Sequence, residues 1–305
     1  MNLRFLETFV WAARLNSFRL AAEKLNLSQA TISARIAALE QELGIKLFQR
    51  SGRDTSLTVQ GERALTGADE LLRAAAKFRL QLNGLEHARG TIRIGVIDAI
   101  AFTLLPLIVD RLNTTYPNVN FELHADTSIN LARQLTESKL HLALLMGPVH
   151  GTDIVSRPMF NLSATWIAGP SFPNAETPID LDVLVSHPII SFPKGSDPHE
   201  TMRGYFRRDV FQAMRVYTSN SVATIVKLVS DGLGVAVLPE AIVKDEITSG
   251  KLLKLDVIQP FPAFAFHLAY VDAPETSLPG LIADLVSAAA HDYCRQETSR
   301  VAWVP

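Results

Sequence analysis

Several features that would mark a secreted or membrane-bound protein are missing from this chain of 305 residues. It holds one cysteine, Cys294, so an internal disulfide and a site built from several thiolates are excluded. Charge, Gly or Pro breaks its apolar runs before they reach the roughly 20 residues of a membrane-spanning helix. The first residues, Met1–Glu7, lack the apolar core and cleavage site of a signal peptide. We therefore expect a cytoplasmic protein with no membrane partner.

Signatures of catalysis are absent as well. The chain has no Gly-x-Ser-x-Gly, no Gly-x-Gly-x-x-Gly and no His-Glu-x-x-His, and its eight histidines are scattered. We expect no enzymatic activity, no cofactor and no metal.

Charge divides the chain unevenly, although the net charge is only −2. Residues 1–90 hold 13 Lys or Arg and 9 Asp or Glu, a net charge of +4. Residues 91–305 hold 16 and 22, a net charge of −6. A basic N-terminal part suits contact with a polyanion, and the acidic remainder does not.

Residues 17–50 carry the most informative pattern. Apolar residues recur at helical spacing in two short runs, which follow a first helix over 3–15. Ser28 stands between the runs where an N-cap belongs. The exposed face of the second helix begins with Gln29, Thr31 and Ser33, followed by Arg35. A helix that enters a DNA major groove needs such groups at its N-terminal end, although a plain helical hairpin with a polar surface has the same periodicity.

The next segment predicts a two-stranded wing. Residues 46–50 lead into the turn 51–54, and 55–57 return as a short strand. Arg50 and Arg53 flank that turn, where they could meet phosphates or a minor groove, or simply lie in solvent. Three helices followed by this hairpin predict a winged helix-turn-helix over residues 1–58.

A long helix is predicted over residues 59–88, with Thr58 as its N-cap. Its apolar positions follow each other at steps of three and four, which is the spacing of a heptad seam. They are Ala68, Leu71, Ala75, Phe78, Leu82 and Leu85. Such a seam favours self-association, and the alternative is a helix packed on its own body. Two recognition helices related by a dyad would read a palindrome. We assign residues 59–90 to a dimerisation helix and hinge.

From residue 91 the pattern alternates between strands and helices, which indicates a parallel sheet with helices on its faces. We expect two α/β lobes, lobe I over about 91–162 plus 266–305 and lobe II over about 163–265. One helix is expected over 200–213.

Open α/β sheets bind ligands beyond the carboxyl ends of their strands. In this chain those ends fall at 97–100, 126–128, 146–148, 191–194 and 218–221. A small-molecule cleft between the lobes is therefore expected. The alternative is that Thr127, Ser128, Asn220 and Ser221 merely cap helices.

Taken together, these residues resemble the LysR-type transcriptional regulators over essentially the full chain. The strongest likeness lies in residues 18–29, and weaker likeness lies in 104–106 and 229–239. Further matching positions are Ser33, Ile36, Leu39, Glu40, Leu43, Gly44, Leu47, Phe48, Arg50, Leu57, Thr58 and Gly61. The resemblance implies a bacterial, cytoplasmic regulator with a winged helix-turn-helix, a linker helix and a two-lobed effector domain resembling periplasmic binding proteins.

The resemblance also implies partners. They are double-stranded operator DNA, a small-molecule effector for which a small organic acid is the suggested class, RNA polymerase, and further copies of the chain assembled as a dimer of dimers. A regulator of this fold that no longer responds to an effector remains an alternative. A solute-binding protein is a third reading, which the DNA-binding pattern and the lack of a signal peptide oppose.

Site residues follow from the matching positions. Gln29, Ala30, Thr31 and Ser33 would lie nearest base edges, capped by Ser28, while Arg35, Arg50 and Arg53 would lie near phosphates. The effector positions are Asp98, Ala99, Ile100, Thr127, Ser128, Met146, Phe192 and Asn220.

The chain departs from the family pattern at four positions. Relatives often carry Pro in place of Ala30 and a long polar side chain in place of Ala34, so Arg35 is expected to substitute for the latter. His141 stands where an Asp is common. Asp98 is unusual beside a pocket that commonly takes carboxylates, and it either caps a helix or accepts from a hydroxyl or amine of the effector.

Overall fold

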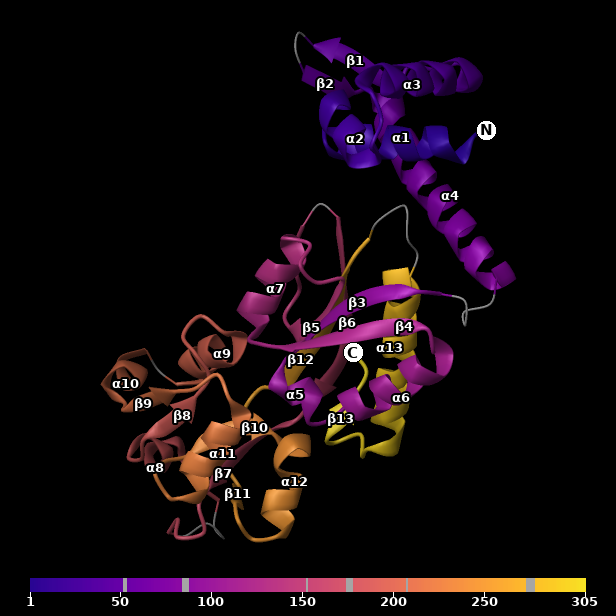
Figure 1. Ribbon diagram of the computed structural model, residues 1–305. Coiled ribbons are helices and arrows are strands. Elements are labelled where there is room, and N and C mark those ends of the chain that lie inside the picture. Colours follow the sequence, from indigo (N-terminus) through magenta and orange to yellow (C-terminus); the bar gives the residue numbers. More distant parts are fainter. Residues whose placement is uncertain (52–53, 84–87, 152, 174–177, 207, 273–277) are drawn as a thin grey trace. The chain divides into compact units, whose positions relative to one another are not determined.

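The computed structural model describes residues 1–51, 54–83, 88–151, 153–173, 178–206, 208–272 and 278–305. They form two compact units, a head within Met1–Ala88 and a body made of Arg89–Val271 and Pro279–Pro305. Figure 1 labels the helices and strands of both.

The head consists of three short helices, a hairpin and a long helix, as the winged helix-turn-helix prediction requires. Its elements are α1 (Leu3–Arg14), α2 (Phe18–Leu25), α3 (Gln29–Leu43), β1 (Phe48–Ser51), β2 (Asp54–Leu57) and α4 (Val59–Asn83). Phe9, Ile32, Leu39 and Leu47 are fully buried in one core that also takes the first turns of α4. Leu47 reaches this core from the segment between α3 and β1, so the wing is attached to the core that positions α3.

Lobe I of the body is built on a mixed sheet. Its elements are β3 (Gly90–Val96), α5 (Asp98–Ala101), α6 (Leu105–Thr115), β4 (Val119–Ala125), α7 (Ser128–Thr136), β5 (Leu142–Met146), β6 (Ile154–Leu162), β12 (Phe264–Val271), α13 (Leu278–Gln296) and β13 (Ala302–Trp303). In the described residues the strand order is β13-β6-β12-β5-β3-β4.

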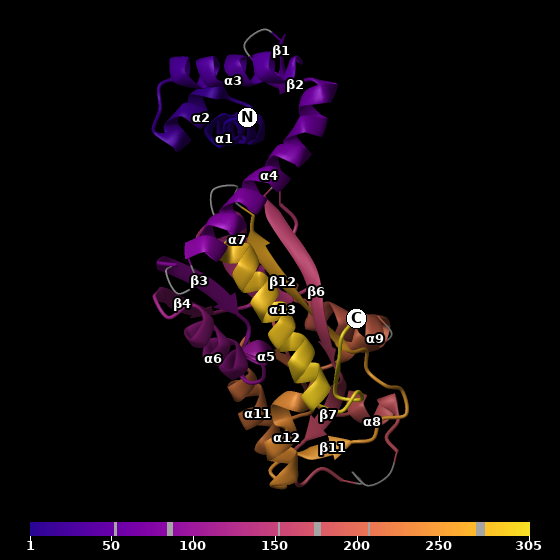
Figure 2. The same cartoon turned by 90° about the vertical axis from the view of Figure 1, so that its right-hand side faces the viewer.

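The expected parallel pairing holds for β3, β4 and β5, and it does not extend to the other strands of this sheet. β3 pairs in parallel with β4 and β5, as the alternation predicts. β12 pairs antiparallel with both β5 and β6, because the chain visits lobe II after β6 and returns through β12 in the opposite direction. Phe160 of β6 and Phe266 of β12 stack at 5.0 Å, and Tyr293 of α13 meets Phe160 edge-on. Figure 2 shows α13 running along the strands of this lobe.

Lobe II contains β7 (Ala164–Ala168), α8 (Leu181–Val185), β8 (Ile189–Ser191), α9 (Asp197–Tyr205), α10 (Arg208–Ala213), β9 (Val216–Thr218), α11 (Val222–Ser230), β10 (Ala236–Pro239), α12 (Glu240–Thr248) and β11 (Leu253–Leu255). β7 lies between β10 and β11, and β8 pairs with β9. α11 packs its apolar face, including Ile225 and Val229, into the core around Ile167 of β7.

The single helix expected over 200–213 is wrong, because the chain breaks it into α9 and α10. Phe206 leaves the helical region with φ −91° and ψ 155°. Its buried ring lies edge-on to Trp166, at 6.1 Å between centroids. Burial of one aromatic ring thus outweighs the continuity of an amphipathic helix.

The two lobes are joined where β6 and β12 lie side by side. The chain leaves the sheet of lobe I after Leu162 and returns to it at Phe264, and these two residues are register partners. Both crossings therefore lie at one end of the same strand pair, which is the arrangement of a two-strand hinge.

Candidate DNA-binding and effector-binding sites

Capping residues shape the corner between α2 and α3. Asn26 ends α2 in the left-handed conformation with φ 53°, which Asn tolerates better than most residues. Two residues later, the Ser28 Oγ accepts a hydrogen bond from the Thr31 N–H at 3.1 Å. The predicted N-cap at Ser28 is therefore confirmed.

The N-terminal face of α3 presents small and polar groups. Gln29, Ala30 and Ser33 are exposed, and no hydrogen bond within the described part of the chain engages the side chain of Gln29 or Ser33. Thr31 is half-buried, and its Oγ1 lies 2.8 Å from the Ser28 Oγ. Gln29 and Ser33 are thus the donors and acceptors most available to a partner.

Arg35 takes a different direction from the other predicted contacts. Its Nη1 donates to the Thr8 Oγ1 at 3.2 Å, and its side chain is half-buried. Thr8 is fully buried on α1 and donates in turn to the Arg4 carbonyl. Arg35 therefore points toward α1 and does not join the exposed residues at the N-terminal end of α3.

A buried carboxylate joins the end of α3 to the wing. Glu40 Oε1 accepts from the backbone N–H of Leu47 at 2.9 Å and of Phe48 at 3.3 Å, and Oε2 meets Lys46 Nζ at 2.5 Å. Burial by itself raises the pKa of Glu40, but the hydrogen bonds from Lys46, Leu47 and Phe48 outweigh burial and hold that pKa below its usual value. The sequence identifies Glu40 as a position that matches the family, but it predicts no role for this side chain.

The long helix is joined to the same segment. The Thr58 Oγ1 accepts from the Gly61 N–H at 2.9 Å, which confirms the predicted cap, and donates to the Lys46 carbonyl at 2.6 Å. A Cβ on Gly61 would lie 2.1 Å from the Leu47 carbonyl oxygen. Only glycine allows α4 to pass this close to the chain before the wing.

The wing itself pairs as predicted, with Phe48 opposite Leu57 and Arg50 opposite Thr55. The side chain of Arg50 and the whole of Arg53 lie outside the described residues. Their expected contacts with phosphates remain predictions.

The apolar seam of α4 begins later than the sequence predicts. Ala68 is only 3% exposed, because it packs with Leu72 in the core of the head. Its assignment to a dimer seam is therefore wrong, since the first half of α4 completes the head.

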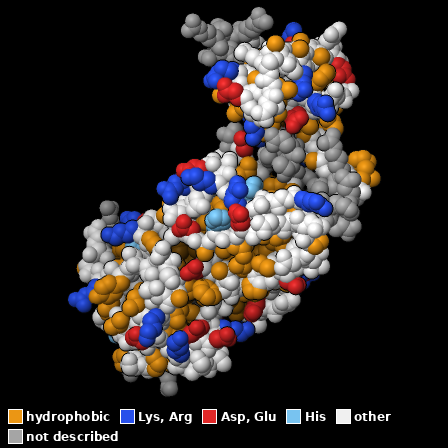
Figure 3. Space-filling model, in the orientation of Figure 1, with side chains coloured by type: hydrophobic (Ala, Val, Ile, Leu, Met, Phe, Trp, Pro, Cys, Tyr) orange, Lys and Arg blue, Asp and Glu red, His pale blue; other side chains and the backbone are white. Residues whose placement is uncertain are grey.

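Further along α4 the seam positions are open. Leu71 is 45% exposed, Phe78 60% and Leu82 69%, and Ala75 is half-buried. Figure 3 shows exposed hydrophobic side chains on this helix. Leu85 lies outside the described residues.

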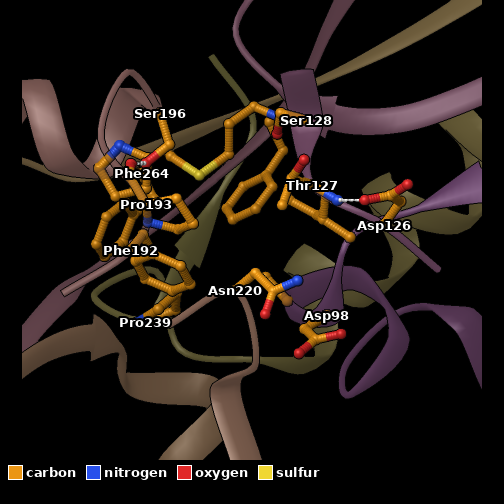
Figure 4. Close-up of a pocket in the computed structure, with 15 residues that line it drawn as sticks. Asp98, Asp126, Thr127, Ser128, Phe192, Pro193, Ser196, Asn220, Pro239 and Phe264 are labelled. Atoms are coloured by element: carbon orange, nitrogen blue, oxygen red, sulfur yellow. Dashed lines mark hydrogen bonds between the residues drawn. The ribbon is translucent and has the colours of Figure 1, made fainter. Parts of the chain in front are cut away.

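In the body, a pocket of about 540 Å³, part of it open to solvent, lies between the lobes. The loops after β3, β4 and β5 and the start of α9 meet there, and Figure 4 shows the residues around it. They are Ile97, Asp98, Ala99, Asp126, Thr127, Ser128, Met146, Phe192, Pro193, Ser196, Pro198, Asn220, Pro239, Phe264 and Phe266.

Of the predicted effector positions, Ile100 alone is wrong as a lining residue. It is fully buried, because the short helix α5 turns it into the core of lobe I. Sequence reasoning missed the lining residues Phe264 and Phe266, because it considered only the carboxyl ends of strands and β12 borders the pocket at its beginning. Asp126 and Pro193 were within the predicted loops but were not singled out.

Two of the polar loop residues serve as caps. The Thr127 Oγ1 accepts from the Asn130 N–H at 3.4 Å at the start of α7, and the Ser221 Oγ accepts from the Thr224 N–H at 3.4 Å at the start of α11. The Ser128 Oγ accepts from the Met146 N–H at 3.0 Å and so ties α7 to the end of β5. Asn220 is exposed in the pocket wall and caps no helix.

Asp98 also caps a helix, but in the opposite lobe. Its Oδ2 accepts from the backbone N–H of Val222, in the first turn of α11, at 2.9 Å. This bond spans 124 positions of the chain and joins lobe I directly to lobe II.

Two family models match the chain. "Bacterial regulatory helix-turn-helix protein, lysR family" matches residues 3–62, and "LysR substrate binding domain" matches residues 85–286. The second match covers most of the body and includes the whole lining of the pocket.

The chain belongs to the LysR family.

Its relatives are transcriptional regulators of similar length. The HTH-type transcriptional regulator YeiE of Escherichia coli K12 is 29% identical over 85% of this chain and 88% of its own. A probable hydrogen peroxide-inducible genes activator of Mycobacterium leprae is 28% identical over 94% of both. The full-length structure of LysG from Corynebacterium glutamicum, with bound effector Arg, shares the fold at a TM-score of 0.57 and 21% identity, covering 96% of this chain and 99% of that one.

This LysR-family protein is thus a DNA-binding transcriptional regulator that carries an effector-binding domain, as the resemblance implies. Regulators of this family bind operator DNA and small-molecule effectors. None of the described helices combines the length and apolar character needed to cross a membrane.

Proposed function

We propose that this LysR-family protein binds operator DNA as a dimer or a dimer of dimers, and that a small molecule in the interlobe pocket controls this binding. The observation that carries the proposal is the Glu40 carboxylate, which joins α3 to the wing. It holds two DNA-facing elements in one fixed relation, with the exposed Gln29 and Ser33 on one of them.

The proposed contacts divide by their chemistry. Gln29, Ala30, Thr31 and Ser33 face base edges, where a Gln side chain can bond adenine in two places. Arg50 and Arg53 meet phosphates, as does Ser28 at the start of the helix, where free N–H groups favour anions. Arg35 reaches a phosphate only by giving up its bond to Thr8, so we place it second to the wing arginines.

Dimerisation is proposed through the later half of α4. Leu71, Ala75, Phe78, Leu82 and Leu85 form the seam, and Ala68 is left out of it. Three large apolar side chains on one solvent-facing helix are typical of a surface that a partner covers.

The proposed division of labour follows the predicted boundaries. Residues 1–58 bind DNA, 59–90 join the protomers, and 91–305 bind the effector through Asp98, Ala99, Thr127, Ser128, Met146, Phe192 and Asn220. A ligand that touches both lobes changes their relation at the hinge near Leu162 and Phe264.

Such a regulator works in the cytoplasm, where chromosomal DNA and RNA polymerase are found, and it catalyses no reaction. Membership of a family of transcriptional regulators supports both statements.

The test uses purified full-length protein and fragmented genomic DNA of its host, with bound fragments sequenced and their protection mapped. Discrete dyad-like sites are expected, and their protection should change when a binding metabolite is added. An Asn220→Trp variant, which fills the pocket from an exposed position, should bind the same sites without that change. Recovery of fragments without any shared sequence would contradict the proposal.

A further inference from the structure

The pocket between the lobes is lined mainly by apolar groups. Phe192, Phe264 and Phe266 contribute aromatic rings, and Met146, Ile97 and several prolines complete the wall. In Figure 4, the labelled Phe and Pro residues lie on one side and Asp126, Thr127 and Asp98 on the other. A pocket of this kind suits a small organic molecule with an apolar body and one polar end.

The charge of the lining is one-sided. No Lys, Arg or His is among the 15 described residues that line the pocket, and its two charged residues, Asp98 and Asp126, are both acidic. A carboxylate ligand would lose its hydration next to two carboxylates without gaining a cation. Like charges in a partly desolvated site repel, so an acid is disfavoured here.

Both carboxylate oxygens of Asp126 already accept hydrogen bonds from residues of lobe I. Its Oδ1 accepts from the Thr127 N–H at 2.7 Å and the Asn130 Nδ2 at 2.8 Å, and its Oδ2 accepts from the Gln134 Nε2 at 3.3 Å. These bonds hold the loop after β4 and leave Asp126 a minor role toward a ligand.

Within the described part of the chain, only one of the two carboxylate oxygens of Asp98 accepts a hydrogen bond. Its Oδ2 accepts from Val222, and within the described part of the chain no hydrogen bond reaches its Oδ1. The first turn of α11 would by itself attract an anionic ligand, because its N–H groups and dipole favour negative charge. Here the chain supplies that anion itself, so this attraction is already satisfied before a ligand enters.

Asn220 stands beside this carboxylate. Figure 4 shows its side chain next to Asp98 at the edge of the pocket, and it makes no hydrogen bond within the described residues. An amide oxygen and a carboxylate oxygen together form a pair of acceptors, which is what a protonated amine requires.

We propose that the effector of this regulator is a small organic cation, an amine with an apolar and preferably aromatic body. Its ammonium group donates to Asp98 Oδ1 and to the Asn220 amide oxygen, while its body packs against Phe192, Phe264 and Phe266. Aromatic faces near an ammonium group add cation–π attraction. This ligand class rests on the proposed effector role of the pocket.

The experiment compares ligands that share an apolar body and differ in their polar group, which is cationic, neutral or anionic. Calorimetry on the full-length protein at pH 7 uses 2-phenylethylamine, 2-phenylethanol and phenylacetate, then the hexyl and indolylethyl counterparts of each. The amine of at least one body should bind more tightly than its alcohol, and its acid should bind most weakly. Tighter binding of the acids, equal binding of amines and alcohols, or no binding by any amine would overturn the proposal.

A single substitution separates charge from shape. Asp98→Asn keeps an oxygen that can accept from Val222 but removes the charge, so it should weaken amine binding by on the order of tenfold or more. Alcohol binding should stay unchanged. Asp110→Asn, at an exposed position on α6, is the matched control and should leave the amine affinity as it was. An equal loss in both variants, or no loss in Asp98→Asn, would contradict the role of Asp98.

DNA binding distinguishes this proposal from the one on which it rests. Amines that bind in the calorimeter without altering DNA protection would leave the ligand class intact and contradict effector control. Acids that bind and alter DNA protection would contradict the cationic ligand class and leave effector control intact.

Discussion

The Glu40 carboxylate and the Leu47 N–H lie 2.9 Å apart and connect the end of α3 to the start of the wing. Glu40 is almost fully buried, whereas Lys46, which pairs with its other oxygen, is mostly exposed. The backbone bonds therefore matter more than the ion pair, since a buried carboxylate that loses such donors is left unpaired.

Glu40→Gln should lower the free energy of unfolding by roughly 1–3 kcal/mol at pH 7, because the charge-assisted bonds are weakened. The folded-state pKa of Glu40 is lowered, so its contribution is present above its ordinary value of 4.5 and lost as the pH falls further. Urea unfolding of the unmodified protein and of Glu40→Gln at several pH values measures this. The difference between their free energies of unfolding should become smaller below pH 4.5. Glu23→Gln, which removes only an exposed pair with Arg19, is the control and should cost little.

Gly61→Ala should destabilise the head by roughly 1–3 kcal/mol, because the new Cβ would meet the Leu47 carbonyl and α4 must shift. Gly67→Ala on the same helix is the matched control, since its Cβ would meet nothing within 4 Å. That change should stabilise by about 0.5–1 kcal/mol through helix propensity. Thermal unfolding measures both, and equal effects would show that the close approach at Gly61 is unimportant.

Gln29→Ala should alter which operator sequences are enriched in a selection from random DNA. Gln41→Ala, which removes the same side chain from the exposed far end of α3, should not. If Gln29→Ala weakened all sequences uniformly, Gln29 would only position the backbone.

Arg50→Ala should weaken binding to all sequences alike and reduce the slope of log affinity against log salt by about 1. Titration of one operator at several salt concentrations measures the slope. An unchanged slope would place Arg50 away from phosphates.

Replacing Leu71 and Phe78 together by Lys should yield monomers in light scattering and weaken operator binding, because charge is introduced into the proposed seam. Val59→Lys, at a still more exposed apolar position at the start of α4, should leave the dimer intact. Dimers that survive the double change would show that the seam lies elsewhere.

His141→Ala should destabilise the body by roughly 1–3 kcal/mol at neutral pH, because the Arg93 N–H would lose the His141 Nδ1 acceptor at 2.9 Å. Burial, followed by the charge of Arg93, lowers the pKa of His141, so the folded protein favours the neutral ring. Its contribution is complete at high pH and declines as the pH falls below the ordinary value of 6.5. The difference in the free energy of unfolding between the unmodified protein and His141→Ala should therefore shrink as the pH falls. His150→Ala, at an exposed position, should leave stability unchanged at every pH.

Local signals were sufficient for the elements of the head. Ser28 and Thr58 cap helices through bonds to residues three positions later, and such bonds can be recognised along the chain. The return of β12 beside β6 could not be recognised this way, because antiparallel pairing across a whole lobe leaves no nearby pattern. Phe206 likewise breaks a helix for a contact with Trp166, which lies 40 positions away.

The sequence by itself determined the class of this protein. Hydrophobic periodicity, caps and the motif around residues 18–29 depend on neighbours within one or two turns, and they identified a winged head, a long helix and two lobes. The tertiary structure decided which of the proposed residues can act. Ile100 and Ala68 are buried in hydrophobic cores, and the Arg35 side chain donates a hydrogen bond to Thr8. The tertiary structure also placed Asp98 on the first turn of a helix in the other lobe, because folding brings together positions that are 124 residues apart.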